Sequence, residues 1–271
     1  MAQVETDEGR GLLAEQRRAA IAAEVRARGG VRVTDLVLRF GVSDMTVRRD
    51  LDALARDGLL EKVHGGAVAL GESSAHEPGF EAKRTLETAA KEAIAEAAAA
   101  LVPRGGAVAL SAGTTTYALA RRLTDVSDLT VVTNSMRIAE LFAQRLRPPG
   151  SRHGATVVLT GGMRTPSDAL VGPVADQAIR SLNFDLAFVG CHGISIGAGL
   201  STPNLAEAET NRALIAAARR VVAVADHSKW GLAGLATFAP LNAVDTWVTD
   251  SGLSEEARAE ATEHIRHLLF A

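Results

Sequence analysis

The fold of the N-terminal part is decided by residues 42–51, which read VSDMTVRRDL. Ser43 is a good N-cap, because its hydroxyl can accept a hydrogen bond from a free backbone N–H in the first turn of a helix. Val47, Leu51 and Leu54 then recur with the spacing of one helical face and give an apolar stripe. The pattern predicts a turn followed by an amphipathic helix, the second helix of a helix-turn-helix.

The segments on either side complete a winged helix. A helix is expected over residues 13–28, because apolar residues share one face there, and a short helix over residues 34–40 has Thr34 as its expected cap. Apolar segments at 59–63 and 67–70 flank the sequence HGG, which is a hairpin signal. Three short helices followed by a hairpin are typical of a winged helix.

The exposed side of the second helix carries side chains suited to DNA. Arg49 points away from the apolar stripe, with Thr46 and Arg48 on its flanks. Arg can pair in bidentate fashion with guanine O6 and N7 or with a phosphate, and Thr can serve either contact. An ordinary amphipathic helix with solvated arginines is the alternative, since three aspartates lie among them. The cap, the turn, the stripe and the wing agree, so the sequence predicts DNA binding.

Length and composition indicate about two domains. A chain of 271 residues is too long for one winged helix, and 47% hydrophobic with 23% charged residues suffices for ordinary cores. The net charge of −3 counts mildly against nucleic acid, although an acidic second domain can mask a local basic surface. The single cysteine excludes an intramolecular disulfide framework. We expect a cytoplasmic protein without signal peptide or membrane span, because the acidic start lacks an apolar core and no apolar run is long enough.

The second part of the chain has the pattern of an α/β domain. Residues 71–79 are polar and rich in breakers, and from Phe80 onward strand-like and helical segments alternate, which predicts a mostly parallel sheet with helices on both faces. The expected domains are a winged helix-turn-helix at 12–70, a linker at 71–84 and an α/β domain at 85–271. Strands are expected at 107–110, 129–133, 156–160, 186–189, 221–225 and 246–249, and helices at 81–101, 116–123, 137–145, 173–181, 205–218 and 255–268.

The loop after the first expected strand is the best candidate for a binding site. In open parallel sheets, ligands bind beyond the carboxyl ends of the strands. Residues 111–116 read SAGTTT: small residues let backbone N–H groups approach an anion, hydroxyls add donors, and the next helix directs its positive dipole end there. The loop therefore predicts a bound phosphate or carboxylate. It is not a Walker A motif, because no Gly-Lys-Ser/Thr follows, and a simple tight turn is the alternative.

Polar residues also follow the other expected strands. They lie at 134–135, 161–163, 190–193 and 226–229. Asp226 and Lys229 are candidates to close the site with a charge pair and a hydrogen-bond donor, whereas the alternative is a surface salt bridge that contributes little.

The cysteine and the histidines do not form a metal site. Cys191 and His192 follow a strand end, but no second cysteine or spaced histidine accompanies them, so we expect no metal and a buried, inert thiol. His264 and His267 are expected side by side on the last helix, in contact with solvent.

Taken together, the two halves resemble the DeoR/GlpR family of bacterial transcriptional regulators. The resemblance runs from about Leu13 to the C-terminus and is carried by ordered motifs: VS at 42–43, TVRRDL at 46–51, HGGA at 64–67, GTT at 113–115, VTNS at 132–135, GG at 161–162, FVG at 188–190, EAE at 207–209 and ADHSK at 225–229. It implies an N-terminal winged helix and a C-terminal sensor domain that looks like ribose-5-phosphate isomerase, in the NagB/RpiA/CoA-transferase class. It also implies repression of sugar or polyol catabolic genes, release by a phosphorylated intermediate, and a homodimer or homotetramer.

Three positions depart from the family pattern. The family often has Asp where this chain has Ser111, Ala-Asp-Gly where it has Cys191-His192-Gly193, and Lys where it has Asn211. These changes all fall near the expected pocket, whereas the loop that would hold a phosphate is intact. An anionic effector is therefore still expected, but the sugar portion of that effector stays open.

The residues and the resemblance together predict a repressor that binds double-stranded operator DNA and a phosphorylated sugar or polyol. DNA is expected to contact Ser43, Thr46, Arg48, Arg49, Lys62 and His64. The effector is expected to contact Ser111, Gly113, Thr114, Thr115, Thr116, Asn134, Gly161, Gly162, His192, Glu207, Asn211, Asp226 and Lys229. No catalytic residue, metal or other cofactor is expected.

Two other functions fit parts of the sequence. A sugar-phosphate isomerase with an added DNA-binding domain needs a positioned general base, and Ser111, His192 and Asn211 replace residues that such a site would use, although acidic residues remain available. A DNA-binding architectural protein with a degenerate second domain is the other alternative, and the intact anion loop argues against it.

Overall fold

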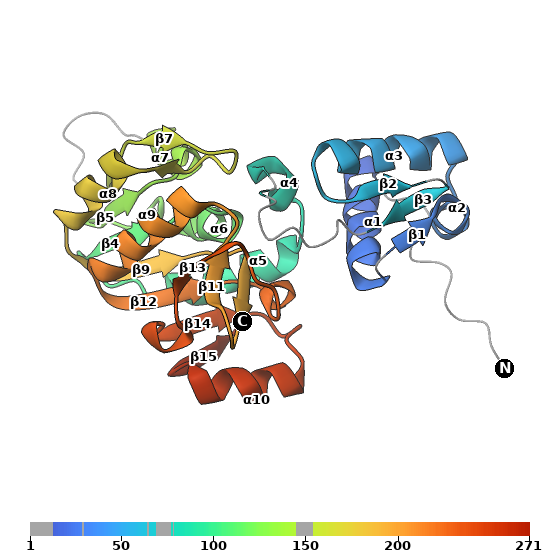
Figure 1. Ribbon diagram of the computed structural model, residues 1–271. Coiled ribbons are helices and arrows are strands. Elements are labelled where there is room, and N and C mark those ends of the chain that lie inside the picture. Colours follow the sequence, from blue (N-terminus) through green and yellow to red (C-terminus); the bar gives the residue numbers. More distant parts are fainter. Residues whose placement is uncertain (1–12, 29, 64, 69–76, 78, 145–153) are drawn as a thin grey trace. The chain divides into compact units, whose positions relative to one another are not determined.

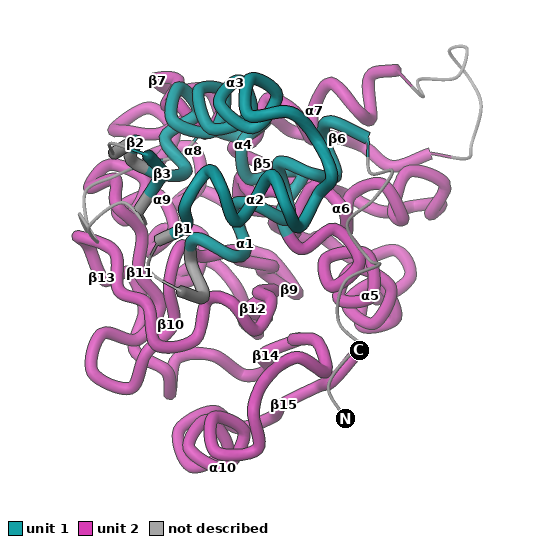
Figure 2. The backbone as a smooth tube through the Cα atoms, turned by 90° about the vertical axis from the view of Figure 1, so that its right-hand side faces the viewer, with its two compact units in different colours: residues 1–86 teal, residues 87–271 magenta. Residues whose placement is uncertain are grey.

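The computed structural model describes residues 13–28, 30–63, 65–68, 77, 79–144 and 154–271 (Figure 1). The chain divides into two compact units, residues 1–86 and residues 87–271, which Figure 2 colours separately. Half of the predicted linker, residues 71–76 and 78, lies outside the described residues. Within the described part of the chain, no helix is both long enough and apolar enough to cross a membrane.

The first unit combines helices with a small antiparallel sheet. Its strands follow the order β1-β3-β2. The elements are α1 (Ala14–Arg28), β1 (Gly30–Arg32), α2 (Val33–Phe40), α3 (Asp44–Arg56), β2 (Glu61–Val63), β3 (Gly66–Val68) and α4 (Phe80–Arg84).

The turn between α2 and α3 forms as its sequence predicts. Gly41 adopts a left-handed conformation with φ 63°, which costs a glycine nothing, and its N–H donates to the Val37 carbonyl at the end of α2. Ser43 then caps α3, because its hydroxyl oxygen accepts a hydrogen bond from the Thr46 N–H at 3.2 Å. The predicted N-cap of α3 is confirmed.

The apolar stripe of α3 forms one side of the core of the first unit. Val47, Leu51 and Leu54 are buried, as the spacing predicts. They pack with buried side chains of the other elements, namely Ile21, Ala22, Val25, Val33, Leu36, Phe40, Leu60, Ala67 and Leu86.

The sequence missed the third strand of the wing and placed one cap wrongly. Strand β1 pairs with β3, and Gly66 makes that pairing possible, because a Cβ at Gly66 would lie 2.1 Å from the Val31 carbonyl oxygen. Since β1 leads directly into α2, that helix begins at Val33 with Arg32 in the cap position and no side-chain cap. The predicted cap at Thr34 is therefore wrong.

A buried ion pair connects α1 to α3. The Arg17 Nε donates to the Asp50 carboxylate at 2.6 Å, and only 8% of Arg17 and 4% of Asp50 is exposed. On the exposed side of α3, by contrast, Asp52 pairs with Lys62 of β2 near solvent. Two aspartates of one helix, two positions apart, thus have opposite surroundings.

The second unit is built on a seven-stranded sheet with the order β15-β14-β12-β9-β4-β5-β6, and every adjacent pair is parallel. The predicted parallel α/β domain is confirmed. The strands are β4 (Ala107–Leu110), β5 (Thr130–Thr133), β6 (Thr156–Leu159), β9 (Phe184–Val189), β12 (Ala218–Val224), β14 (Thr246–Thr249) and β15 (His267–Phe270).

Helices cover both faces of this sheet (Figure 1). Alternate residues of a strand point to opposite faces, so Val108 and Leu110 pack against α5 (Thr88–Ala99), α6 (Thr114–Leu123) and α7 (Met136–Ala143). Ala109 packs on the opposite face, which is covered by α8 (Pro173–Arg180), α9 (Leu205–Ala216) and α10 (Glu255–His264).

Smaller sheets complete the second unit. One has the order β10-β11-β13, and β7 and β8 form a separate antiparallel pair. None of these short strands was predicted from the sequence. They are β7 (Met163–Arg164), β8 (Leu170–Val171), β10 (Gly193–Ser195), β11 (Gly199–Thr202) and β13 (Ala236–Ala239).

Two predicted helices of this region are wrong in extent. The helix expected over 81–101 is interrupted between α4 and α5, where Glu87 has a left-handed φ of 48°. The helix expected over 255–268 ends at His264, because the backbone that follows pairs with the free edge of β14 to form β15. His267 therefore lies on a strand and not beside His264 on a helix.

Asp50→Ala should destabilise the first unit strongly, because it leaves the Arg17 guanidinium buried without its carboxylate. The expected loss in the free energy of unfolding is about 3–5 kcal/mol. Asp52→Ala, on the same helix but at an exposed pair, should cost about 0–1 kcal/mol. Urea unfolding of both variants measures the difference, and equal losses would contradict the structural role of the buried pair.

Candidate functional site

The exposed face of α3 carries the side chains predicted to contact DNA. Arg48 and Arg49 are both exposed, and they differ in their partners. The Arg48 Nε donates to the Asp44 carboxylate at 2.5 Å, and this hydrogen bond raises the pKa of Arg48 above its ordinary value. Arg49 forms no ion pair with any residue that the structure describes. Arg49 is therefore the guanidinium of this pair that is free for a new acceptor.

The other predicted DNA contacts lie around this helix. The hydroxyls of Ser43 and Thr46 lie 2.9 Å apart and hydrogen bond to each other at the start of α3. Lys62, on the wing, is exposed and pairs with Asp52. His64 lies outside the described residues. The structure thus brings the wing and the recognition helix together through Lys62.

In the second unit, the middle of the sheet contains a topological switch point. After β4 the chain passes to β5 on one side, and it later returns to β9 on the other side. Ser111 follows β4 and bridges the gap: its N–H donates to the Phe188 carbonyl, and its hydroxyl accepts from the Gly190 N–H, both at 3.0 Å. Ligands of open α/β sheets bind at such points.

The loop between β4 and α6 presents an unused set of donors. The N–H groups of Gly113, Thr114, Thr115 and Thr116 donate to no acceptor among the described residues, as expected for the first turn of a helix. The hydroxyls of Thr114 and Thr115 have no partner there either. Thr116 differs, because its buried hydroxyl donates to the Gly113 carbonyl at 3.0 Å. This first turn has the donors that an anion needs.

Asn134 holds this loop in place. Its side-chain oxygen accepts from the Ala112 N–H at 2.8 Å, and its amide nitrogen donates to the Leu170 carbonyl at 3.1 Å. The residue is completely buried. Asn134 was predicted to contact the effector, and in the structure its amide connects the loop to β8.

The glycines after β6 have a packing role. Gly162 has φ 121°, and a Cβ there would lie 2.6 Å from the Val171 carbonyl oxygen of β8. Gly161 has φ 75°, a left-handed conformation that favours glycine. Both residues let the chain turn closely around β8, which itself receives the hydrogen bond from Asn134.

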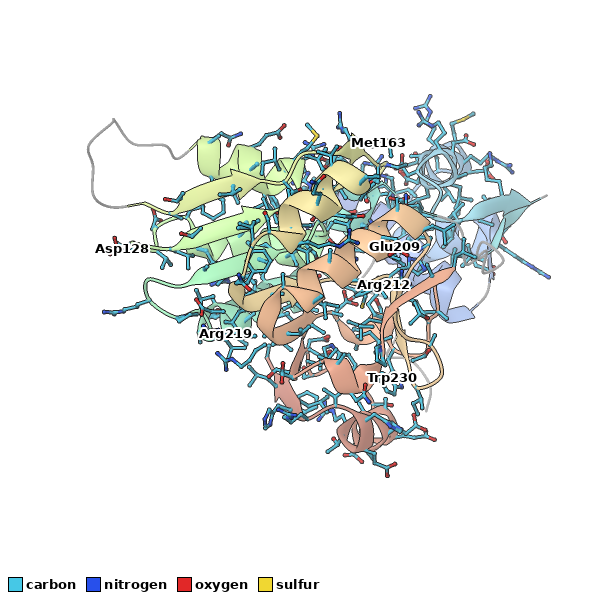
Figure 3. The ribbon with its side chains drawn as sticks, turned by 60° about the vertical axis from the view of Figure 1, so that its left-hand side comes forward. Asp128, Met163, Glu209, Arg212, Arg219 and Trp230 are labelled. Carbon is cyan, nitrogen blue, oxygen red and sulfur yellow. The ribbon has the colours of Figure 1, made fainter. Side chains whose placement is uncertain are left out.

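The start of α9 lies next to the loop. Ala206 packs against Ala112 of the loop in a small apolar cluster. The Glu207 carboxylate accepts from the Thr202 hydroxyl at 3.2 Å, and one turn later Asn211 is buried with its side-chain oxygen unpartnered. Glu209, on the same helix, is exposed and pairs with Arg212 (Figure 3). The helix therefore turns Glu207 and Asn211 inward and Glu209 to solvent.

A second buried acceptor follows β12. Asp226 is completely buried, and one of its oxygens accepts from the Ser228 N–H at 3.1 Å, whereas the other has no donor. No ion pair joins Asp226 to Lys229 among the described residues, so the predicted charge pair does not form. Lys229 is half-buried and ends a short 3₁₀ turn, and Trp230 after it stacks on Trp247 at a centroid distance of 5.5 Å.

Cys191 shares the electrostatic surroundings of these two residues. Burial raises the pKa of its thiol to about 12; the Lys229 cation lowers this pKa in part, and Asp226 raises it. The adjoining His192 is half-buried, and its N–H donates to the Ser201 carbonyl at 2.9 Å. No group of acidic, cysteine and histidine side chains among the described residues has the arrangement of a metal site.

Asp250, at the end of β14, was missed by the sequence analysis. Burial would raise the pKa of its carboxyl, but hydrogen bonds from the His227 and Gly252 N–H groups and from the His227 ring lower that pKa below its ordinary value. This carboxylate fixes the turn that carries Lys229. Only the pairing of β12 with β14 brings it there, so no sequence motif could have indicated it.

Comparison with known proteins gives two family matches. A model described as "DeoR-like helix-turn-helix domain" matches residues 17–73, and a model described as "DeoR C terminal sensor domain" matches residues 86–251. The chain is 32% identical to a "Putative aga operon transcriptional repressor" of Escherichia coli O157:H7, covering 89% of this chain and 88% of that protein. It is also 32% identical to the "Glycerol-3-phosphate regulon repressor" of Escherichia coli (strain K12), covering 92% and 96%.

Among solved structures, a D-ribose-5-phosphate isomerase in complex with phospho-erythronic acid aligns with a TM-score of 0.38 and 16% identity, covering 52% of each chain.

Native Cys191 should resist alkylation at pH 8. A thiol with a pKa of about 12 has a thiolate fraction at that pH on the order of 10³ lower than an ordinary cysteine thiol. Because the chain has one cysteine, the mass increase after iodoacetamide treatment reports on this site alone. Labelling should become fast in urea, and equally fast labelling of the folded protein would contradict the raised pKa.

Proposed function

This chain belongs to the DeoR family of transcriptional regulators, and on that premise we propose that it represses a sugar or polyol catabolic operon and leaves its operator when a phosphorylated effector binds. The family is one of regulators, so the chain is not an isomerase with an added domain. In the proposed division of roles, residues 12–70 bind DNA and residues 85–271 sense the effector. The names of the two relatives, an aga operon repressor and a glycerol-3-phosphate regulon repressor, support this class of target gene.

One observation carries the effector proposal: the first turn of α6 has hydrogen-bond donors that meet no acceptor among the described residues. Four successive N–H groups, at residues 113–116, and the hydroxyls of Thr114 and Thr115 have no partner in the described part of the second unit. A phosphate has the charge and the number of oxygens to accept from such a set, and the positive end of the helix dipole favours it.

The rest of the proposed effector is a chain or ring with hydroxyl groups. Asn211 and Asp226 each have a buried oxygen without a donor. Buried acceptors are nearly always hydrogen-bonded, so these two oxygens favour a ligand that brings its own O–H donors. Lys229, which has no acidic partner among the described residues, is available to a ligand oxygen.

DNA docking is proposed to use α3 in the major groove, with the wing beside it. Arg49 is the best candidate for reading a base edge, because it is exposed and forms no ion pair with a described residue. Arg48 is proposed to contact a phosphate, because the Asp44 carboxylate already accepts a hydrogen bond from its guanidinium. A phosphate contact needs less exact geometry than bidentate pairing with a base edge.

A homodimer or homotetramer is proposed, because one winged helix offers a small interface and specific affinity usually needs two half-sites. Exposed apolar side chains that suit such assembly lie on and near β6, an edge strand of the described sheet. Val158 and Leu159 of β6 are 40% and 43% exposed, and Met163 and Val174 nearby are 63% and 65% exposed.

Arg49→Ala should cost about 1–3 kcal/mol in operator binding and relax specificity at one base pair, if Arg49 reads a guanine edge. Arg48→Ala should weaken binding to all sequences alike. The measurement is a gel-shift titration with an operator that the protein itself selects from a random-sequence library. If both variants bind that operator as tightly as the wild type, the docking of α3 is wrong.

Thr114→Glu should separate DNA binding from induction. The residue is half-buried at the start of α6, so a carboxylate there takes the place of the phosphate without entering the core. An effector shifts a repressor only through its different affinity for the DNA-free and DNA-bound forms. The variant should therefore bind the operator normally and give no thermal shift with phosphorylated sugars or polyols. It should also remain bound to the operator when these effectors are added.

The control for this variant is Thr262→Glu, which adds the same charge at an exposed position of α10. It should respond to the effector like the wild type. Constitutive release of DNA by Thr114→Glu would mean that the carboxylate mimics the ligand, which still supports an anion site at this loop. Normal induction of Thr114→Glu would refute the loop as the effector site.

A further inference from the structure

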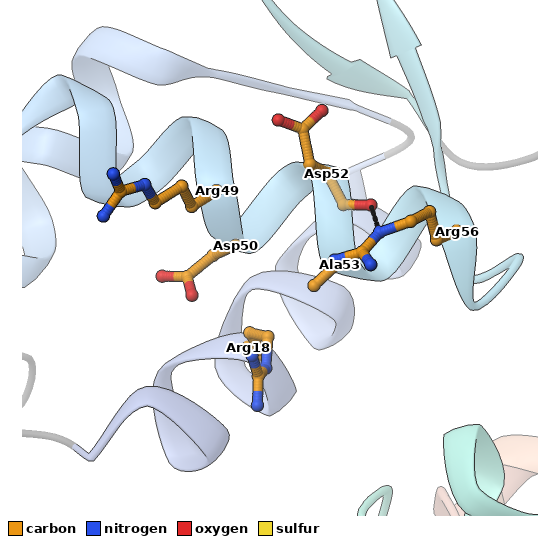
Figure 4. A pocket seen from close by; sticks show the side chains of 6 residues that line it. All are labelled: Arg18, Arg49, Asp50, Asp52, Ala53 and Arg56. Carbon is orange, nitrogen blue, oxygen red and sulfur yellow. Dashed lines mark hydrogen bonds between the residues drawn. The ribbon is translucent and has the colours of Figure 1, made fainter.

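A groove between α1 and α3 is lined by residues that, apart from Arg49, are not among the DNA contacts predicted from the sequence. Its volume is about 540 Å³, and it is lined by Arg18 of α1 and by Arg49, Asp50, Asp52, Ala53 and Arg56 of α3 (Figure 4). The groove is strongly charged, and three of its six lining residues are arginines. It therefore extends the charged surface of the recognition helix onto a second helix.

Both acidic residues of the groove already have cationic partners outside it. The Asp50 carboxylate accepts from Arg17 on the buried side, and the Asp52 carboxylate pairs with Lys62 of the wing. The arginines, by contrast, are available. Arg18 and Arg49 form no ion pair with any described residue, and the Arg56 Nε donates only to the Asp52 backbone carbonyl at 3.3 Å. Once the ion pairs of the two aspartates are taken into account, the net charge of the groove is positive.

The three arginines of the groove are spread over two helices. Arg49 and Arg56 are seven positions apart on α3, which is about 10 Å along the helix axis. Arg18 reaches the same groove from α1, which crosses beside α3 (Figure 4). A small anion needs donors that converge on one point, whereas guanidiniums spread along a groove suit a polyanion that carries repeated charges.

We propose that this groove binds the phosphate backbone of DNA at the side of the recognition helix, with Arg18 and Arg56 as phosphate contacts. The assignment rests on the proposed docking of α3 in the major groove, because Arg49 and Arg56 lie on the outward stripe of that helix. Arg18 adds a contact from α1, a helix that precedes the helix-turn-helix. Together with Lys62 on the wing, it places cations on both flanks of α3.

The test measures salt dependence with Arg18→Ala. Each lost phosphate contact should make the slope of log K against log [salt] less steep by about 0.9, and a mixed-sequence duplex and the selected operator should lose affinity alike. The loss should be on the order of tenfold at low salt. Arg56→Ala should behave in the same way, whereas Arg84→Ala, on α4 and outside the groove, should match the wild type.

A second variant separates charge from structure. Arg18→Lys keeps the positive charge on a flexible side chain and should retain the wild-type slope, even if Arg18→Ala also lowers the unfolding midpoint. If Arg18→Ala and Arg84→Ala have the same affinity and slope, the groove is not a phosphate site. That result, with Arg49→Ala still impaired, leaves the docking of α3 intact; failure of the wild type to bind any duplex would instead overturn the proposed function.

Discussion

The pairing of β4 with β9 in the middle of the parallel sheet is the constraint on which the second unit depends. It sets Val108 opposite Leu186, so the ends of two strands distant in sequence meet at one edge. Ser111, at the end of β4, joins them there through two hydrogen bonds to the end of β9. A neutral side chain suffices for this bridge, and the loop that follows can therefore present its N–H groups without a carboxylate beside them.

The buried acceptors at this edge give the proposed effector a source of binding energy. An acceptor buried without a donor costs about 1–3 kcal/mol, and Asn211 and Asp226 each contain one. Neighbouring hydrogen bonds hold them in place: Thr210, next to Asn211 on α9, donates to Asp176, and Asp226 caps the 3₁₀ turn that follows β12. A ligand hydroxyl that donates to either oxygen gives that oxygen the hydrogen bond that no described residue supplies.

Sequence patterns indicated the parts of this structure that depend on local chemistry. The Ser43 cap, the apolar stripe of α3 and the small residues before α6 follow from one segment each. Strands β1 and β15 depend instead on partners far along the chain, which no local periodicity reveals. The same reason explains Asn134, whose amide looked available in the sequence and is engaged by Ala112 and Leu170.

The net charge of −3 counted mildly against nucleic acid as a partner, and the structure shows why this indication from composition was misleading. Within α3 the acidic residues are not free negative charges, because Asp44, Asp50 and Asp52 each pair with a cation. Such pairing cancels charge locally and leaves the unpaired guanidiniums to set the sign of the surface. Attraction to DNA depends on that local field within about 8–10 Å. A chain that is acidic overall can therefore present a DNA-binding surface that is basic.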